Sequence, residues 1–113
     1  MKEIDLHIHT KYSIDGELSP KEIVELAIQK EIKIIAITDH NSINGIQEAV
    51  EYANGKNIIV VPGIEISCKE EGIFEIHILG LFINPENILF PSLEKPSITE
   101  AIKMIKNSGG IPI

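Results

Sequence analysis

The chain has 113 residues, 43% of them hydrophobic, so it is long enough for one domain with a packed core. Its formal charge is −7, with ten lysines and no arginine, and an acidic chain without guanidinium groups is a poor autonomous binder of nucleic-acid backbones. Cys68 is the only cysteine, which excludes an internal disulfide, and no apolar run has the length of a signal peptide or membrane span, so we expect a cytoplasmic protein without a membrane partner.

The first predicted element is a strand over residues 3–9, where apolar and polar residues alternate. The apolar set is Ile4, Leu6 and Ile8, and the polar set is Asp5, His7 and His9. This alternation predicts that each set lies on its own face of the strand. Two imidazoles in a buried strand are costly unless something satisfies them, so the rest of the chain should supply a partner.

The elements that follow alternate between helix and strand. A helix is predicted over residues 19–31, because Ser19 and Glu22 have the spacing of a capping box at its start. Strands are predicted at residues 32–38, 57–67 and 72–83, helices at residues 44–53 and 97–107, and the start of a further strand within residues 108–113. Ser97 and Glu100 form a second capping box at the start of the later helix.

This order of elements predicts an α/β fold in which parallel strands alternate with helices through right-handed crossovers. The predicted strands make up about half of a closed barrel, which usually needs about 250 residues. An open sheet of this size has edges that need cover. We therefore expect a second copy of the chain, or a partner chain, to lie along the open sheet edge.

The ionisable side chains collect where parallel strands would end. His7 and His9 are expected on one face of the first strand, about 7 Å apart. Asp15 lies in the loop after this strand, His40 just after the second strand, and Glu65 just beyond the "VPG" of the third. Because ligands bind at the carboxyl ends of parallel strands, these side chains are expected to form one cluster. His77, on the fourth strand, is a further candidate.

Imidazole and carboxylate groups without thiolate suit zinc, manganese or iron in an open catalytic site. The two oxygens of Glu65 could bridge two cations, and such ions activate water and hold phosphoryl oxygens. Taken alone, His77 is better explained as a hydrogen-bonded core residue than as a ligand. Asp5 and Asp39 are read either as acids that orient the imidazole rings or as plain solvated acids. Cys68 is expected to be a small buried or edge residue rather than a ligand.

Four segments in order carry a resemblance to a known family: "HIHTKYSIDGELSPKEIVELA", "AITDHNSINGIQEA", "VPGIEIS" and "EIHILGLFI". Together they resemble the N-terminal half of the PHP family, named for polymerase and histidinol phosphatase, and most closely its stand-alone phosphoesterase branch. The resemblance implies a distorted (β/α)7 TIM-like barrel that binds up to three zinc, manganese or iron ions. It also implies hydrolysis of a small phosphorylated substrate, either a phosphomonoester or a nucleotide or oligonucleotide phosphoester, by metal-activated water.

The family motifs imply a role for each ligand. His7 and His9 would hold one metal, Glu65 would bridge it to a second held by His77, and Asp15 with His40 would hold a third. The family's later His-Pro and Asp-x-His motifs do not occur in the 113 residues.

The chain is therefore interpreted as a single PHP-type domain, residues 1–113, that lacks the later barrel strands, and its hydrolase activity is expected to need them. Two alternatives remain open at this point. One is a non-catalytic metal-binding or assembly module, and the other is a metal-dependent amidohydrolase, since a His-x-His on a first barrel strand also resembles that class.

Overall fold

The structure, a computed structural model, describes residues 3–13, 15–70, 73–88 and 95–113. Its elements in chain order are β1 (Ile4–Ile8), α1 (Pro20–Gln29), β2 (Ile34–Ile37), α2 (Ile46–Ala53), β3 (Ile59–Glu70), β4 (Ile73–Leu81), the 3-10 helix η1 (Pro85–Asn87), α3 (Ile98–Asn107) and β5 (Ile111–Pro112). Within these ranges the strands form a five-stranded sheet in the order β1-β2-β3-β4-β5. The prediction of a mixed α/β fold is confirmed, and the elements lie close to their predicted places.

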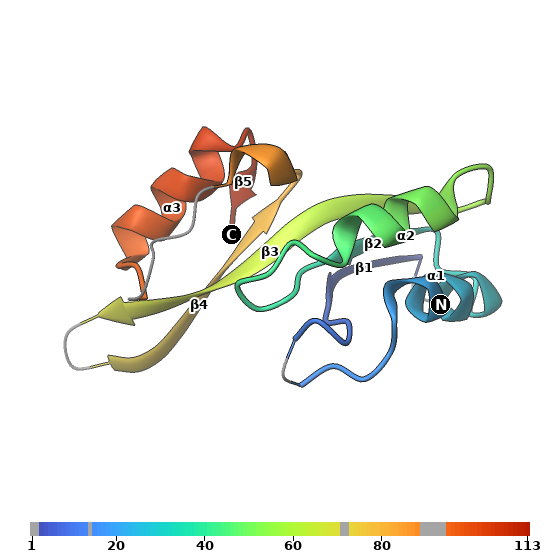
Figure 1. Ribbon diagram of the computed structural model, residues 1–113, viewed down its shortest axis with the longest axis horizontal. Coiled ribbons are helices and arrows are strands. Elements are labelled where there is room, and N and C mark those ends of the chain that lie inside the picture. The colour runs from blue at the N-terminus through green and yellow to red at the C-terminus, as the bar shows by residue number, and fades with distance from the viewer. Residues whose placement is uncertain (1–2, 14, 71–72, 89–94) are drawn as a thin grey trace.

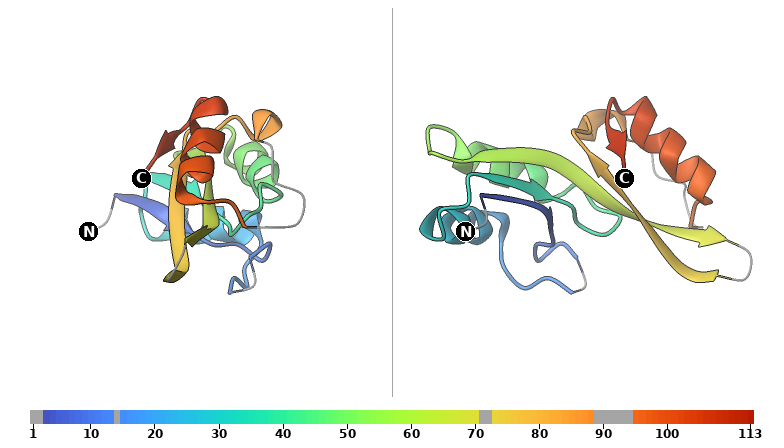
Figure 2. Two further views of the ribbon diagram at one scale, coloured as in Figure 1. Left: turned by 90° about the vertical axis from the view of Figure 1, so that its left-hand side faces the viewer. Right: turned by 180° about the vertical axis from the view of Figure 1, so that it is seen from behind.

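The molecule is elongated because β3 and β4 form a long twisted hairpin (Figure 1). Its extents are 43 × 24 × 24 Å. Helices α1 and α2 lie at the end where β3 begins, and α3 packs on the hairpin at the opposite end, as the view from behind shows (Figure 2). In the part of the chain that is described, every helix is too short to cross a lipid bilayer.

The three helices cover one face of the sheet, which holds the main core. The buried side chains of this helix face are Ile23, Val24, Ala27, Ile35, Ile37, Ile46, Ala49, Ala53, Ile58, Ile64, Ile66, Cys68, Ile83, Ile88, Ala101 and Ile105. The other face carries a smaller apolar cluster, and we call this side the open face. Its cluster consists of Leu6, Ile34, Ala36, Val61 and Leu81. Most of the stabilisation that comes from burial of apolar surface is therefore contributed by the helix face.

The prediction that all strands are parallel is wrong for β4, which runs opposite to the other four described strands. β1, β2 and β3 pair in parallel, but β3 pairs with β4, and β4 with β5, in antiparallel register. β3 ends at Glu70 and β4 begins at Ile73. So short a link cannot hold the crossover of a dozen or more residues that parallel neighbours need, and the two strands form a hairpin instead.

The prediction that Ile4, Leu6 and Ile8 share one face of β1 is also wrong. Asp5 pairs with Ile35 and Ile8 with Ile37, so three steps along β1 match two along β2. A shift of this kind exchanges the faces of the side chains on its two sides. Leu6 consequently packs in the cluster of the open face, whereas Ile8 packs on the helix-face core.

Both predicted capping boxes are confirmed. The Ser19 hydroxyl accepts a hydrogen bond from the Glu22 N–H at 3.1 Å, and the Glu22 carboxylate accepts one from the Ser19 N–H at 3.0 Å. Ser97 and Glu100 make the same reciprocal pair at the start of α3. The backbone bond from Ser19, followed by the bond from its hydroxyl, lowers the pKa of Glu22 below its ordinary value.

We expect Ser19→Ala to lower the free energy of unfolding by about 1 kcal/mol in neutral solution, because a helix N–H loses its acceptor. A carboxylate whose pKa is lowered in the folded state stabilises above its unfolded pKa, and this contribution disappears as the pH falls through the folded value. The pH dependence of stability below the ordinary pKa of glutamate should therefore weaken in the variant. Urea unfolding in neutral and acidic buffer measures both effects, with Ser19→Thr as the control that keeps a hydroxyl. Equal stability of Ser19→Ala and the parent chain would contradict the prediction.

Candidate metal centre

Four imidazoles converge on one buried carboxylate, that of Glu65. Its side chain lies on the open face of β3 and is only 3% exposed. Oxygen Oε2 is in contact with His7 Nε2 and lies 3.4 Å from His9 Nε2. Oxygen Oε1 lies 3.3 Å from His40 Nδ1 and 3.1 Å from His77 Nδ1. All four histidines of the chain thus surround this one acid.

A second carboxylate, Asp15, faces two of the same rings from the loop after β1. One of its oxygens lies 3.0 Å from His9 Nδ1, and the other lies 3.5 Å from His40 Nε2. Desolvation acts to raise the pKa of Asp15, but the hydrogen bond and charge of His9, with a smaller effect of His40, hold it below its ordinary value. The Asp15 side chain is 56% exposed, so it stands at the solvent side of the cluster while Glu65 lies at its buried side.

These six side chains divide into three neighbouring groups whose ligand atoms lie within 4.8 Å of one another. The groups are His7, His9 and Glu65; His9, Asp15 and His40; and His40, Glu65 and His77. His9, His40 and Glu65 each belong to two groups. Every ligand atom is an imidazole nitrogen or a carboxylate oxygen, so the set fits zinc, manganese or iron. The partly exposed rings leave one side of the cluster open to solvent.

The backbone brings the cluster together at the place where β2 ends. His40 forms a parallel bridge with Glu65, and the Glu65 N–H donates to the Asp39 carbonyl at 3.0 Å. Asn41, whose φ is +49°, continues this pairing: its N–H donates to the Glu65 carbonyl at 2.9 Å, and its side-chain oxygen accepts from the Ser67 N–H at 3.0 Å. Asparagine tolerates this left-handed conformation better than most residues.

Two expectations about the site need correction. Glu65 is expected just beyond "VPG", at the carboxyl end of the third strand, but it lies well inside β3, which continues to Glu70 as one side of the hairpin. Asp5 and Asp39 were expected to orient imidazole rings or to be solvated. Asp39 is instead fully buried among backbone and hydroxyl donors rather than rings. Asp5 accepts a hydrogen bond from the His7 backbone N–H at 3.2 Å and is not buried, which agrees with the solvated alternative.

The hydroxyls of Thr10 and Ser13 were missed by sequence reasoning. Both are buried and donate to the Asp39 carboxylate at 2.6 and 2.7 Å. Short polar residues in a loop that also carries candidate ligands were the available signal. The buried partner could not be recognised without the structure, because Asp39 lies more than twenty residues away in sequence.

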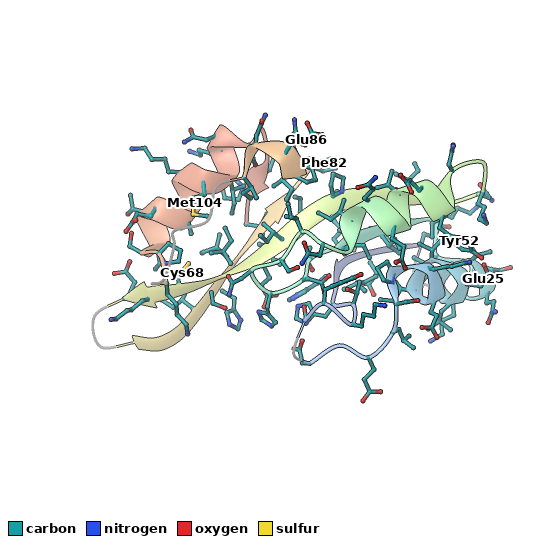
Figure 3. The ribbon with its side chains drawn as sticks, in the orientation of Figure 1. Glu25, Tyr52, Cys68, Phe82, Glu86 and Met104 are labelled. Carbon is teal, nitrogen blue, oxygen red and sulfur yellow. The ribbon has the colours of Figure 1, made fainter. Side chains whose placement is uncertain are left out.

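Cys68 lies on the opposite side of the sheet from the cluster. It is buried in the helix-face core, where Met104 of α3 packs against the same core (Figure 3). Desolvation, with a smaller effect of the nearby charge of Glu70, raises the pKa of the Cys68 thiol. The expectation of a small buried residue is confirmed, and a raised pKa disfavours the thiolate that metals bind.

Comparison with known proteins points in one direction. The family model described as PHP domain matches residues 5–108. An uncharacterized protein, MJ1587 of Methanocaldococcus jannaschii, is 37% identical over 96% of the chain, and a 3',5'-nucleoside bisphosphate phosphatase of Chromobacterium violaceum is 33% identical over 94%. A crystal structure from Bifidobacterium adolescentis, assigned as a candidate metal-dependent phosphoesterase, superposes on 76% of the chain with a TM-score of 0.69 and 31% identity.

All three of these proteins are longer than the chain. It spans 64% of the Methanocaldococcus protein, 34% of the Chromobacterium phosphatase and 29% of the Bifidobacterium structure.

Proposed function

Because the chain belongs to the PHP domain family, we propose that it is a metal-dependent phosphoesterase that hydrolyses a phosphomonoester or a nucleotide or oligonucleotide phosphoester. The observation that carries the proposal is the cluster itself: two carboxylates and four imidazoles arranged as three adjacent groups. The names of relatives support the same chemistry, since one is a nucleoside bisphosphate phosphatase.

The proposed ligands follow the three groups. His7, His9 and Glu65 would hold one divalent ion, Glu65 would share a second with His77, and Asp15 and His40 would hold a third. Zinc, manganese and iron are the proposed ions, in a number up to three. When bound, such ions lower the pKa of water and neutralise charge on phosphoryl oxygens.

The chain's own side chains define where a substrate approaches. Glu65 closes the buried side with 3% exposure, whereas His7 and Asp15 are 53% and 56% exposed at the solvent side. A phosphoryl group would therefore enter from the side of the loop after β1. The acidic chain has lysine as its only strongly basic side chain, which supports a small phosphorylated substrate rather than autonomous binding of a nucleic acid.

We also propose that the described sheet is the N-terminal part of a (β/α)7 barrel. The cluster of the open face lies beside apolar side chains that are largely exposed, with Ile59 at 60%, Ile111 at 54% and Ile113 at 66%. Further strands, a partner chain or a second copy of the chain would cover this surface. The greater lengths of the relatives support the first of these. Residues 1–113 are then one part of a single PHP-type domain.

The proposed location is the cytoplasm, because the lone thiol of Cys68 is free and buried, as is usual in a reducing compartment.

The test compares metal content and hydrolysis in the protein, together with the further strands or partner proposed above, purified without chelator or affinity metal. We expect one or more metal ions per chain and metal-stimulated release of phosphate from a panel of phosphomonoesters and short oligonucleotides. His7→Ala/His9→Ala should lose the metal and at least about a hundredfold of the phosphate release, since even the residues that support metal ligands contribute 10- to 100-fold. Lys103→Ala/Lys106→Ala, exposed on α3, is the matched double control.

Each outcome has a distinct meaning. Metal in the parent protein with no hydrolysis above the double-histidine variant would favour the alternative, a non-catalytic metal-binding or assembly module. Absence of metal from the parent protein even after addition of manganese, zinc or iron would overturn the proposed function.

A further inference from the structure

A buried hydrogen-bond network lies beneath the candidate metal centre. Asp39 has no exposed surface, and its carboxylate accepts three short hydrogen bonds. The Thr10 N–H and the Ser13 hydroxyl donate to Oδ1 at 2.5 and 2.7 Å, and the Thr10 hydroxyl donates to Oδ2 at 2.6 Å. Hydrogen bonds to a buried carboxylate are among the strongest in proteins, so these three groups are held as one unit. We call Thr10, Ser13 and Asp39 the buried triad.

Each member of the buried triad is close in sequence to one member of a single ligand group. Thr10 follows His9 and Asp39 precedes His40, while Ser13 lies two residues before Asp15. His9, Asp15 and His40 are the ligand group that combines the loop after β1 with the end of β2. The triad thus ties together the backbone segments from which all three of these ligands project.

Ser13 makes the most direct link to a ligand. Its hydroxyl donates to Asp39 at 2.7 Å and accepts from the His40 backbone N–H at 2.9 Å. The hydroxyl therefore links the buried carboxylate of Asp39 directly to the backbone of His40. The Ser13 carbonyl also accepts from the Gly16 N–H at 3.2 Å, which turns the loop around Asp15.

The start of α2 packs closely against the triad. Gly45 is buried, and a Cβ atom there would lie 3.1 Å from the Thr10 hydroxyl oxygen and 3.2 Å from Asp39 Oδ2. These distances are tighter than ordinary contacts. The triad is consequently confined by the start of α2 as well as by its own hydrogen bonds.

We propose that the buried triad positions the His9–Asp15–His40 group and so sets the affinity of that group for its metal ion. The proposal rests on the proposed function, because it takes this group to be a metal site. Thr10, Ser13 and Asp39 are positioning residues, since they act through the backbone of the ligands. The other two groups each share one ring with this group, His9 or His40, but both also contain Glu65, to which the triad makes no described hydrogen bond.

The test measures metal binding in Ser13→Ala by equilibrium dialysis against Zn²⁺ and by elemental analysis. We expect the affinity of one metal ion per chain to fall by about 10- to 100-fold while the remaining metal stays bound. Ser13→Thr, which keeps the hydroxyl, should restore the affinity. Ser19→Ala is the matched control, because it also deletes a serine hydroxyl and weakens the fold but lies in the cap of α1.

The outcomes separate this proposal from the proposed function. Absence of metal from the parent protein would overturn the proposed function. A parent protein that binds metal, with a Ser13→Ala variant of equal metal affinity, would overturn only the positioning role of the buried triad. Loss of all metal ions together, or an equal loss in Ser19→Ala, would show a general effect on stability and would also overturn it. If Ser13→Ala does not fold, Thr10→Val takes its place and Thr10→Ser is the variant that keeps the hydroxyl. Thr10→Val removes the hydroxyl that donates to Asp39 but leaves the backbone N–H that also donates to it. The same criteria then apply.

Discussion

Glu65→Gln is expected to remove more than one metal ion per chain and to reduce metal-dependent phosphate release by at least about a hundredfold. The carboxylate belongs to two of the three ligand groups, and it is the acid toward which all four imidazoles turn. Glutamine has nearly the same shape but no charge, and its amide nitrogen cannot bind a cation. Elemental analysis and phosphate release measure the two effects.

The control for Glu65→Gln is Glu25→Gln on α1. Glu25 accepts a hydrogen bond at 2.6 Å from the hydroxyl of Tyr52, so that the pair joins α1 to α2 (Figure 3). This bond, with desolvation and the Glu25 charge, raises the pKa of Tyr52. The control applies the same chemical change to another hydrogen-bonded carboxylate and should leave metal content unchanged. A Glu65→Gln protein with its full metal content would contradict the assignment of Glu65 as a shared ligand.

Gly16→Ala is expected to lower the free energy of unfolding by about 1–3 kcal/mol and to release the metal of the His9–Asp15–His40 group. A Cβ atom at this position would lie 1.9 Å from the Thr10 carbonyl oxygen and 2.5 Å from the Thr10 carbonyl carbon. Neither is a flexible side-chain end, so the backbone of the loop has to move. Asp15 is the neighbouring residue and moves with it. Urea unfolding and elemental analysis measure the two results.

Gly55→Ala is the matched control for this effect. Gly55 has a φ of +80°, and a Cβ atom there would have no described neighbour within 4 Å, so alanine is strained only by its backbone conformation. This variant should lose stability and keep its metal. Parent-like stability and metal content in Gly16→Ala would show that the loop after β1 accommodates a side chain and does not hold Asp15 tightly.

Local patterns predicted the elements well because their causes are local. Ser19 with Glu22 and Ser97 with Glu100 each satisfy helix N–H groups within a few residues, so the sequence contains both donor and acceptor. The second strand, at residues 32–38, is a continuous β-branched run, and β2 lies within it. The same local patterns also predicted that four of the ligands lie at or beyond strand ends: His7, His9, Asp15 and His40.

The errors concern relations between elements. The alternation of Ile4, Leu6 and Ile8 predicts a single face along β1, but the shift against β2 moves Ile8 to the helix face. That shift depends on how two strands pair, which no pattern within β1 records. The hairpin of β3 and β4 was likewise missed, although the short link between the predicted strands was a signal for it.

By itself the sequence determined the local elements and the chemical character of the site, because helix caps, β-branched runs and the supply of imidazole and carboxylate groups are properties of short segments. Only the tertiary structure decided which side chains meet. Glu65 becomes the common partner of four histidines because β2, β3 and β4 pair around it, and Asp39 becomes the buried acceptor for Thr10 and Ser13 because two strand ends lie side by side. Contacts between residues so far apart in sequence depend on strand register and direction, and these are set by the packing of the whole sheet.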